Sequence, residues 1–240
     1  MFATRRMRRF ALALAAAGTL PRLLRVARRS GVGDADVERV LAGDELIANP
    51  ELQIDRATVI RAPADQVWPW LVQLGKGRAS WYMPAWLERL LVWPARKRSA
   101  RRIVDELQSL APGDLVPDWG PGDPSFKVIE LDPPRALVYL SLRDRSRNWS
   151  WPADEGAPGG PPSSGVMAFS WALVLEEIDA SSCRLHIRLR GRFGRRGRLR
   201  GVTMALGGLF DYLTIIVLFA GLKQRLARPQ APAPLIQPRD

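Results

Sequence analysis

The chain has 240 residues, of which 47% are hydrophobic, so one domain with extensions, or two small domains, can bury a sizeable core. Its single cysteine, Cys183, excludes an intrachain disulfide and a cysteine-rich metal site. Its single histidine, His186, excludes His-rich metal sites and relays of two imidazoles. We therefore expect neither a metal nor a cofactor, and most familiar hydrolytic chemistry is disfavoured.

The net charge of +12 is concentrated in three segments that contain no acidic residue. Residues 1–30 carry eight Arg, residues 89–102 carry six Lys or Arg, and residues 184–200 carry eight Arg, whereas acidic residues outnumber basic ones elsewhere. Such localised charge indicates an anionic surface as partner, or else solvated arginine faces in an Arg-rich composition. Because no RNA-recognition strand or helix-turn-helix pattern accompanies the arginines, an anionic membrane surface is favoured and nucleic acid is disfavoured.

The N-terminal segment, residues 1–30, combines a charged start with a short apolar run, and Ala15 to Ala17 resemble the cleavage site of a secretory signal. The four arginines between positions 22 and 29 oppose export and favour a helix that lies on an anionic membrane. This interpretation predicts a cytoplasmic protein that is peripheral at the inner membrane face. Residues 31–51 are predicted to be a linker with one short helix.

A β-rich run over residues 52–61 precedes a helix that begins near Pro63 and ends at Gly75, and a second short helix is predicted from Pro84 to about Leu91. Strands are then predicted at residues 113–118, 125–131, 136–142, 165–178 and 183–193. In the fourth strand large and small apolar residues alternate, so both faces are predicted to be largely dry. In the fifth, Leu and Ile alternate with Arg and His186, which predicts an exposed strand histidine.

Residues 202–228 form the last predicted element, a helix that is apolar nearly all round, and residues 229–240 form a Pro-rich tail without expected structure. From Met204 to Leu222 the only charged residue is Asp211. The segment is therefore either a helix buried along a sheet or one that spans a bilayer.

The order of elements is that of the helix-grip fold, an α+β fold in which a curved antiparallel sheet wraps a long C-terminal helix. The stretches that carry a family resemblance are APADQVWPWLVQLGKGRASWYMPAWLERLL, PGDLVP, FKVIELDPPRALVYL, SWALVLEEID and FDYLTIIVLFAGLKQRLA. They resemble bacterial members of the START-like, Bet v 1-like superfamily labelled SRPBCC or polyketide cyclase/dehydrase. The matches span residues 54–228, so we expect one START-like domain over residues 52–228.

The resemblance implies a cavity between sheet and helix that takes lipids, sterols, polyketides or similar apolar molecules. The glycines of GKGR allow the chain to reverse there, which places the following aromatic residues where the two short helices close one end of the sheet. Aromatic side chains with a few polar groups are typical of such pockets. We expect the ligand-binding residues to be Trp81, Tyr82, Trp86, Phe169, Trp171 and Asp211, whereas Trp68 and Trp70 are expected in the core.

The predicted function is non-enzymatic binding of a hydrophobic small molecule or lipid at a membrane surface. The first alternative is an enzyme like a polyketide cyclase, for which Asp211, Tyr82 and Arg78 are candidate acid, base or polar groups. Asp211 also has a structural alternative, in which it pairs with an arginine or caps a kink in the helix. The second alternative is a membrane protein with residues 204–222 spanning the bilayer.

Two further features indicate an interaction surface. The apolar sequence LTIIVLFAGL follows FDY where the resemblance leads us to expect a charged stretch, so a partner or a membrane is expected to cover it. Residues 143–165, which carry Trp149 and Trp151, form a long Pro/Gly-rich loop that predicts a lid or a membrane-interface anchor.

Overall fold

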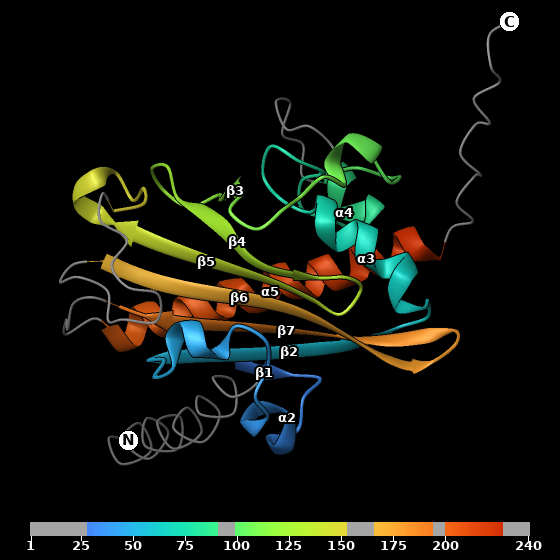
Figure 1. The fold of residues 1–240 in the computed structure, drawn as a ribbon, viewed down its shortest axis with the longest axis horizontal. Helices are drawn as coiled ribbons and strands as arrows, with labels where there is room; N and C mark the ends of the chain where they lie inside the picture. Colours follow the sequence, from blue (N-terminus) through green and yellow to red (C-terminus); the bar gives the residue numbers. More distant parts are fainter. Residues whose placement is uncertain (1–27, 91–98, 153–165, 194–199, 228–240) are drawn as a thin grey trace, which may run out of the picture.

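The computed structural model of the chain describes residues 28–90, 99–152, 166–193 and 200–227 (Figure 1). Its strands are β1 (Arg29–Ser30), β2 (Leu52–Ile60), β3 (Leu115–Pro117), β4 (Ser125–Asp132), β5 (Ala136–Asp144), β6 (Val166–Asp179) and β7 (Ser182–Arg192). Its helices are α2 (Asp34–Glu38), α3 (Ala64–Gln73), α4 (Ala85–Leu90) and α5 (Arg200–Leu226), with 3-10 turns η1 (Asp44–Ile47), η2 (Asp105–Leu107) and η3 (Arg145–Arg147).

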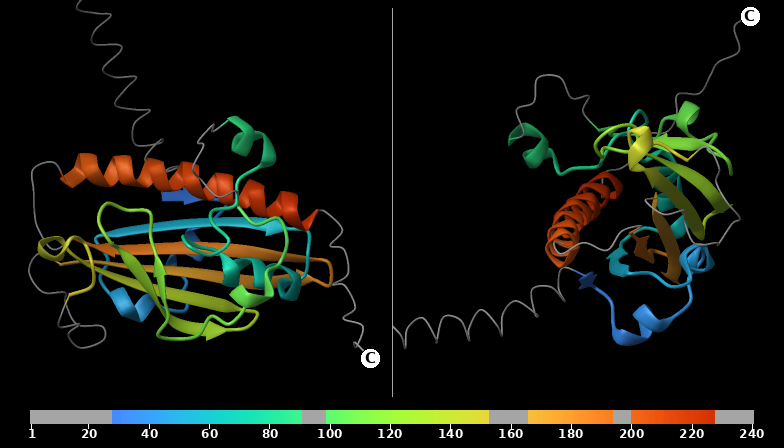
Figure 2. Two further views of the ribbon diagram at one scale, coloured as in Figure 1. Left: turned by 90° about the horizontal axis from the view of Figure 1, so that it is seen from above. Right: turned by 90° about the vertical axis from the view of Figure 1, so that its left-hand side faces the viewer.

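The strands form one sheet in the order β1-β2-β7-β6-β5-β4-β3, and its neighbours are antiparallel except for β1 and β2. The long helix α5 crosses one face, called the inner face here, and the segment that follows the edge strand β1, residues 31–51, lies on the opposite, outer face (Figure 2). A curved, largely antiparallel sheet around a long C-terminal helix is the predicted α+β helix-grip fold. The prediction of fold class is therefore confirmed.

The hydrophobic core lies between the inner face, α3 and the second half of α5. The apolar positions of α3 recur every three or four residues, so Val67, Trp70 and Leu71 share one buried stripe. Leu218 and Leu222 on α5 are also fully buried in this core. Because burying each such side chain stabilises the fold by about 2 kcal/mol, apolar packing is sufficient to hold both helices on the sheet.

A glycine brings α5 directly against the loop that follows α3. A Cβ at Gly221 would lie 2.5 Å from the carbonyl oxygen of Tyr82 and 2.8 Å from the backbone nitrogen of Met83. The buried Arg225 side chain, one helical turn later, donates hydrogen bonds to the carbonyl oxygens of Gly221, Met83 and Ala100. Close backbone contact and a buried guanidinium thus fix this half of α5.

Residues 31–51, predicted to be a linker, contain α2 and η1 and pack against the outer face. Leu41 and Ile47 are buried, and Gly43, with φ of 79°, lies so close to β5 that a Cβ would meet a methyl carbon of Val138 at 2.3 Å. This part of the outer face is consequently covered by the chain itself.

Within the described residues, no helix is both long and apolar enough to cross a bilayer. The alternative in which residues 204–222 span the membrane therefore finds no support in the described part of α5. The predicted basic segment is described only from residue 28 onward, and the predicted Pro-rich tail lies outside the described residues.

Candidate ligand-binding site

Five aromatic side chains gather on the inner face. This aromatic cluster consists of Trp81, Trp119, Phe126, Tyr139 and Trp171. The ring of Trp171 stacks on Trp81 and on Tyr139, with centroids 6.0 Å and 5.9 Å apart. Phe126 lies 6.1 Å from Trp171, and Trp119 meets Trp81 edge-on at 5.7 Å. Such flat, apolar surfaces are what ligand pockets typically present to hydrophobic molecules.

Three separate parts of the chain position this cluster. The register of β5 and β6 places Tyr139 directly opposite Trp171. Trp81 comes from the loop between α3 and α4, which reverses at the two glycines of GKGR, both at positive φ. Its indole Nε1 donates a 3.0 Å hydrogen bond to the carbonyl oxygen of Thr214 on α5. Trp81 is therefore held between the sheet and the helix.

The first half of β6 reverses the usual order of burial. Its small residues face outward and are buried, whereas the inward-facing Phe169 and Trp171 are only half-buried. Further along the strand, Leu173 and Leu175 also face inward and are buried in the core. Large apolar rings thus keep accessible surface in one region of the inner face, while the rest of that face is packed.

Arg143 on β5 borders the aromatic cluster. Its guanidinium lies 5.4 Å from the ring centroid of Phe126 and 5.0 Å from that of Phe169. It also forms a 2.6 Å ion pair with Asp118 and donates a hydrogen bond to Ser141 Oγ. Because the carboxylate of Asp118 balances its charge, this border combines polar groups with no large net charge. It can orient the polar end of a mostly apolar ligand.

The described part of the loop over residues 143–165 ends at residue 152. Trp151 lies against β4, where its indole Nε1 donates to the carbonyl oxygen of Ser125 and the Lys127 ammonium lies 4.5 Å from its ring centroid. Trp149 instead lies beneath the guanidinium of Arg145. The prediction of a lid or membrane anchor concerns a loop whose remaining residues are outside the described part.

The predicted ligand-binding residues do not all meet at one place. Trp81 and Trp171 belong to the aromatic cluster. Phe169 packs edge-on against Phe193 at 5.6 Å, beneath Arg143 at the border of the cluster. Trp86 lies on α4, with 61% of its surface exposed.

Tyr82 is a core residue. Its hydroxyl donates a 2.8 Å hydrogen bond to the carbonyl oxygen of Trp70, and the two rings meet edge-on at 5.5 Å. The guanidinium of Arg225 lies 4.7 Å from the centroid of the Tyr82 ring. Burial raises the pKa of Tyr82 above its ordinary value. A small pocket lies nearby, between α4 and the end of α5, and is lined by Met83, Ala85, Glu88, Arg101, Gln224 and Arg225.

Asp211 forms an ion pair with Arg56 of β2, with 2.7 Å between Nη2 of the guanidinium and the carboxylate. The Arg56 guanidinium also donates to the carbonyl oxygen of Gly208 and lies 5.2 Å from the ring centroid of Tyr212. Burial raises the pKa of Asp211, although the positive charge of Arg56 opposes that shift. This is the structural role that the sequence left open for Asp211.

Sequence reasoning missed Trp119, Phe126, Tyr139 and Arg143. The alternation of residues 125–131 and 136–142 carries part of the signal, because Tyr139 and Arg143 occupy positions of β5 that share one face. The alternation does not reveal the register of β5 against β6, which places Tyr139 opposite Trp171. In the described part of the chain, no group of three or more His, Cys, Asp or Glu residues is placed to hold a metal ion.

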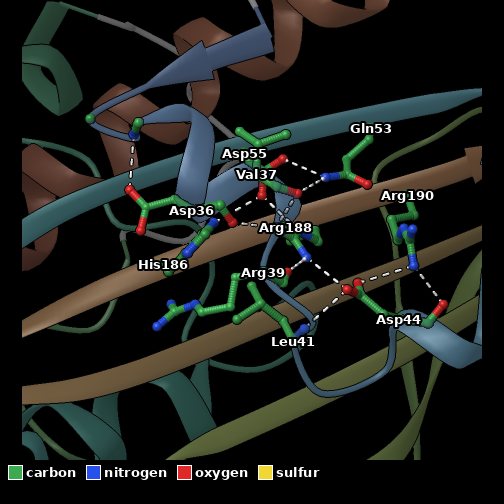
Figure 3. Close-up of polar contacts among 12 residues, drawn as sticks. Asp36, Val37, Arg39, Leu41, Asp44, Gln53, Asp55, His186, Arg188 and Arg190 are labelled. Carbon is green, nitrogen blue, oxygen red and sulfur yellow. Dashed lines mark hydrogen bonds and ion pairs between the residues drawn. The ribbon is translucent and has the colours of Figure 1, made fainter.

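A second cluster, of charged groups, lies on the outer face (Figure 3). The carboxylate of Asp55 lies 2.9 Å from His186 Nε2 and accepts a 2.7 Å hydrogen bond from Arg188 Nε. Burial by itself raises the pKa of Asp55, but the hydrogen bonds from His186, Arg188 and Gln53 together lower it below its ordinary value. The guanidinium of Arg188 also pairs with Asp44 at 2.7 Å.

This network has no access to a substrate, because the exposed fractions of the Asp55, His186 and Arg188 side chains are 1%, 0% and 2%. The other N–H groups of Arg188 donate hydrogen bonds to the backbone carbonyl oxygens of Asp36, Val37 and Arg39, which belong to the segment that covers it. The prediction of an exposed His186 is wrong, since the face that alternation marks as polar is covered by residues 28–51. The network is structural.

No family model and no curated protein matches the chain. Among solved structures, the chain is similar to a protein from Arthrobacter aurescens at 14% identity, covering 78% of this chain and 93% of that one with a TM-score of 0.39. It is similar to CalU16 from Micromonospora echinospora at 15% identity, with coverages of 73% and 84% and a TM-score of 0.30. DynU16, from the dynemicin biosynthetic locus, is 13% identical, with coverages of 73% and 47% and a TM-score of 0.35. At such low scores, the fold assignment rests on the sheet and α5 themselves.

Proposed function

We propose that this protein binds a hydrophobic small molecule or lipid on the aromatic cluster, between the sheet and α5. The observation that carries the proposal is the half-buried state of Phe169 and Trp171 on a strand whose small residues are buried. Large aromatic side chains that keep accessible surface on an otherwise packed face gain stability when an apolar molecule covers them. The resemblance of the sequence to the SRPBCC superfamily supports the same location.

The geometry favours a ligand with a flat apolar body and one polar end. The partly exposed rings of Trp81 and Trp171 stack on each other, and a planar or chain-like hydrocarbon can pack against them, whereas Tyr139, which stacks on Trp171, is buried. Arg143 and Asp118 at the border provide a donor and an acceptor for a hydroxyl or carbonyl group. Polyketides, sterols and lipids share this chemistry.

Binding is favoured over the cyclase-like alternative because the three candidate catalytic groups all have structural partners. Asp211 pairs with Arg56, and the Tyr82 hydroxyl donates to a backbone carbonyl in the core. Arg78 donates to the carbonyl oxygens of Val72 and Leu107. A general acid or base must reach the proton that it transfers, whereas these groups are held by structural partners.

Native mass spectrometry of the full chain, purified from its own host and followed by organic extraction, tests the proposal directly. We expect a co-purifying apolar molecule whose mass identifies the ligand class. If the protein carries no bound molecule and instead converts an offered polyketone, the enzyme alternative is correct.

A titration with Nile red locates the site. This probe is uncharged, so the basic segments of the chain do not attract it as they would an anionic dye. We expect Trp171→Ala and Trp119→Ala to weaken its binding about tenfold, which corresponds to about 1.4 kcal/mol. Trp119 is 40% exposed, so its replacement is the milder change to the fold. The matched control is Trp86→Ala, at an exposed tryptophan on α4 outside the cluster, which should bind like the wild type.

A further inference from the structure

The middle of α5 exposes a stripe of apolar residues. Leu209, Phe210, Leu213 and Ile216 have exposed fractions of 48%, 71%, 55% and 39%. Positions 209, 213 and 216 recur at the spacing of one helical face, and Ala220 continues it as an exposed residue. The opposite face of the helix carries the ion pair of Asp211 and the buried core residues. Leu209, Phe210, Leu213 and Ile216 are called the outer stripe of α5, where outer refers to the side of the helix opposite its buried residues.

The short helix α4 carries a second group of exposed apolar residues. It lies beside the C-terminal end of α5, where the backbone N–H of Ala85 donates to Gln224 Oε1, and it projects away from the sheet (Figure 2). Trp86 and Leu90 on α4 are 61% and 69% exposed. Exposed large apolar residues gathered on neighbouring elements of one chain mark an interaction site.

Two of the three basic, acid-free segments of the sequence join the fold beside α4 and α5. Residues 1–30 lead into β1, which pairs with β2, the strand to which α5 is tied by the Arg56–Asp211 ion pair. Residues 89–102 begin at the end of α4, where Arg89, Arg101 and Arg102 are exposed. In residues 184–200, by contrast, Arg184, Arg188 and Arg190 pair with acidic residues on the outer face. Exposed apolar side chains and exposed arginines thus occur together at α4 and in the residues that follow it.

We propose that the outer stripe of α5, together with Trp86 and Leu90, docks on the surface of an anionic lipid bilayer. Apolar side chains enter the boundary between headgroups and acyl chains, while the arginines contact the lipid phosphates, as in interfacial amphipathic helices. A second copy of this chain fits less well, because a twofold contact places each patch and its arginine-rich border against the same patch and border. Nucleic acid offers the phosphates but no apolar layer for the stripe.

Vesicle co-sedimentation of the full chain tests this proposal. The probes are phosphatidylcholine vesicles with and without phosphatidylglycerol, and the stripe variants are Leu213→Gln alone and with Phe210→Gln. The matched control is Leu115→Gln on β3, the same substitution at a leucine with 57% exposure on the opposite edge of the sheet. We expect binding to the anionic vesicles, about a tenfold weaker partition coefficient for the double variant, and no change for the control.

Three results would overturn the proposal. The first is equal binding of wild type and stripe variants to anionic vesicles, and the second is equal binding of wild type to both kinds of vesicle. The third is a wild-type dimer in light scattering that the stripe variants dissociate, because a second copy would then cover the stripe. Nile red affinity and thermal unfolding are measured on every variant. Unchanged values show that lost vesicle binding reflects neither unfolding nor loss of the ligand site.

Discussion

Arg188 and Asp55 form a 2.7 Å hydrogen-bonded ion pair in the middle of the outer face, where both side chains are almost inaccessible to solvent. The same guanidinium binds the backbone of residues 36–39, so one side chain joins β7, β2 and the segment that covers them. A charge buried to this degree is tolerated because its donors are satisfied. Arg188 therefore ties residues 36–39 to the sheet.

Replacing Arg188 by Met is expected to destabilise the protein strongly. The substitution leaves the buried carboxylate of Asp55 without its guanidinium, which costs about 3 kcal/mol or more. Hydrogen exchange should lose protection first in residues 28–51. Arg184→Met is the control, because Arg184 pairs with Asp36 at a more exposed position, and its loss should cost about 1 kcal/mol. Equal effects of the two variants in urea unfolding would contradict this account.

Low pH is expected to weaken the contacts that hold residues 36–39 on the outer face. The hydrogen bond and charge of Arg184 lower the pKa of Asp36 from 3.8 to about 2, and Asp55 also has a pKa below its ordinary value. A carboxylate with a lowered pKa in the folded state stabilises the fold above its unfolded pKa, and this contribution is lost as the pH falls through the folded pKa. The difference in unfolding free energy between wild type and Arg184→Met should therefore shrink from about pH 4 to about pH 2. A pH-independent difference in urea unfolding would exclude this role of Asp36.

The sequence predicted the fold better than it predicted which faces are buried. Hydrophobic periodicity located α3 and β7, turn residues such as Pro, Gly and Asp marked the ends of β4 to β6, and the long apolar run of residues 202–228 located α5. The alternation of Leu and Arg along β7 was interpreted as one buried and one exposed face, but His186 and Arg188 are buried. A single strand does not reveal that another segment will cover its polar side. The acidic residues Asp36 and Asp44 opposite the arginines were the available signal.

The candidate site was predicted in part for a similar reason. Trp81 and Trp171 were identified from the glycine turn and from the apolar strand, and the structure stacks them. Trp86 and Tyr82 lie within five residues of Trp81 in the sequence, yet one is exposed on α4 and the other is buried beneath Arg225. Local sequence does not determine on which side of a short, irregular segment each ring lies. Tertiary contacts decide this.

Removing the hydroxyl of Tyr82 tests whether this residue belongs to the core or to the ligand site. Tyr82→Phe keeps the ring but removes the hydrogen bond to the carbonyl oxygen of Trp70. We expect the unfolding free energy to fall by about 1 kcal/mol and the affinity for Nile red to stay unchanged. Urea unfolding and a Nile red titration on the same preparation measure both quantities. A weaker affinity without loss of stability would place Tyr82 in the ligand site.

Substitutions at two glycines of α5 provide the sharpest test of how this helix packs against the loop that contains Tyr82. Gly221→Ala places a methyl group 2.5 Å from the carbonyl oxygen of Tyr82, and since the contact is with backbone, the helix or the loop has to move. We expect a loss of at least about 2 kcal/mol in unfolding free energy and a weaker Nile red affinity, because the same loop carries Trp81. Gly207→Ala is the matched control. A Cβ at Gly207 meets no atom within 4 Å in the structure, so alanine should stabilise the helix by up to about 1 kcal/mol. If both substitutions stabilise the protein, α5 does not lie against the Tyr82 backbone as described, and the helix is free to move relative to the aromatic cluster.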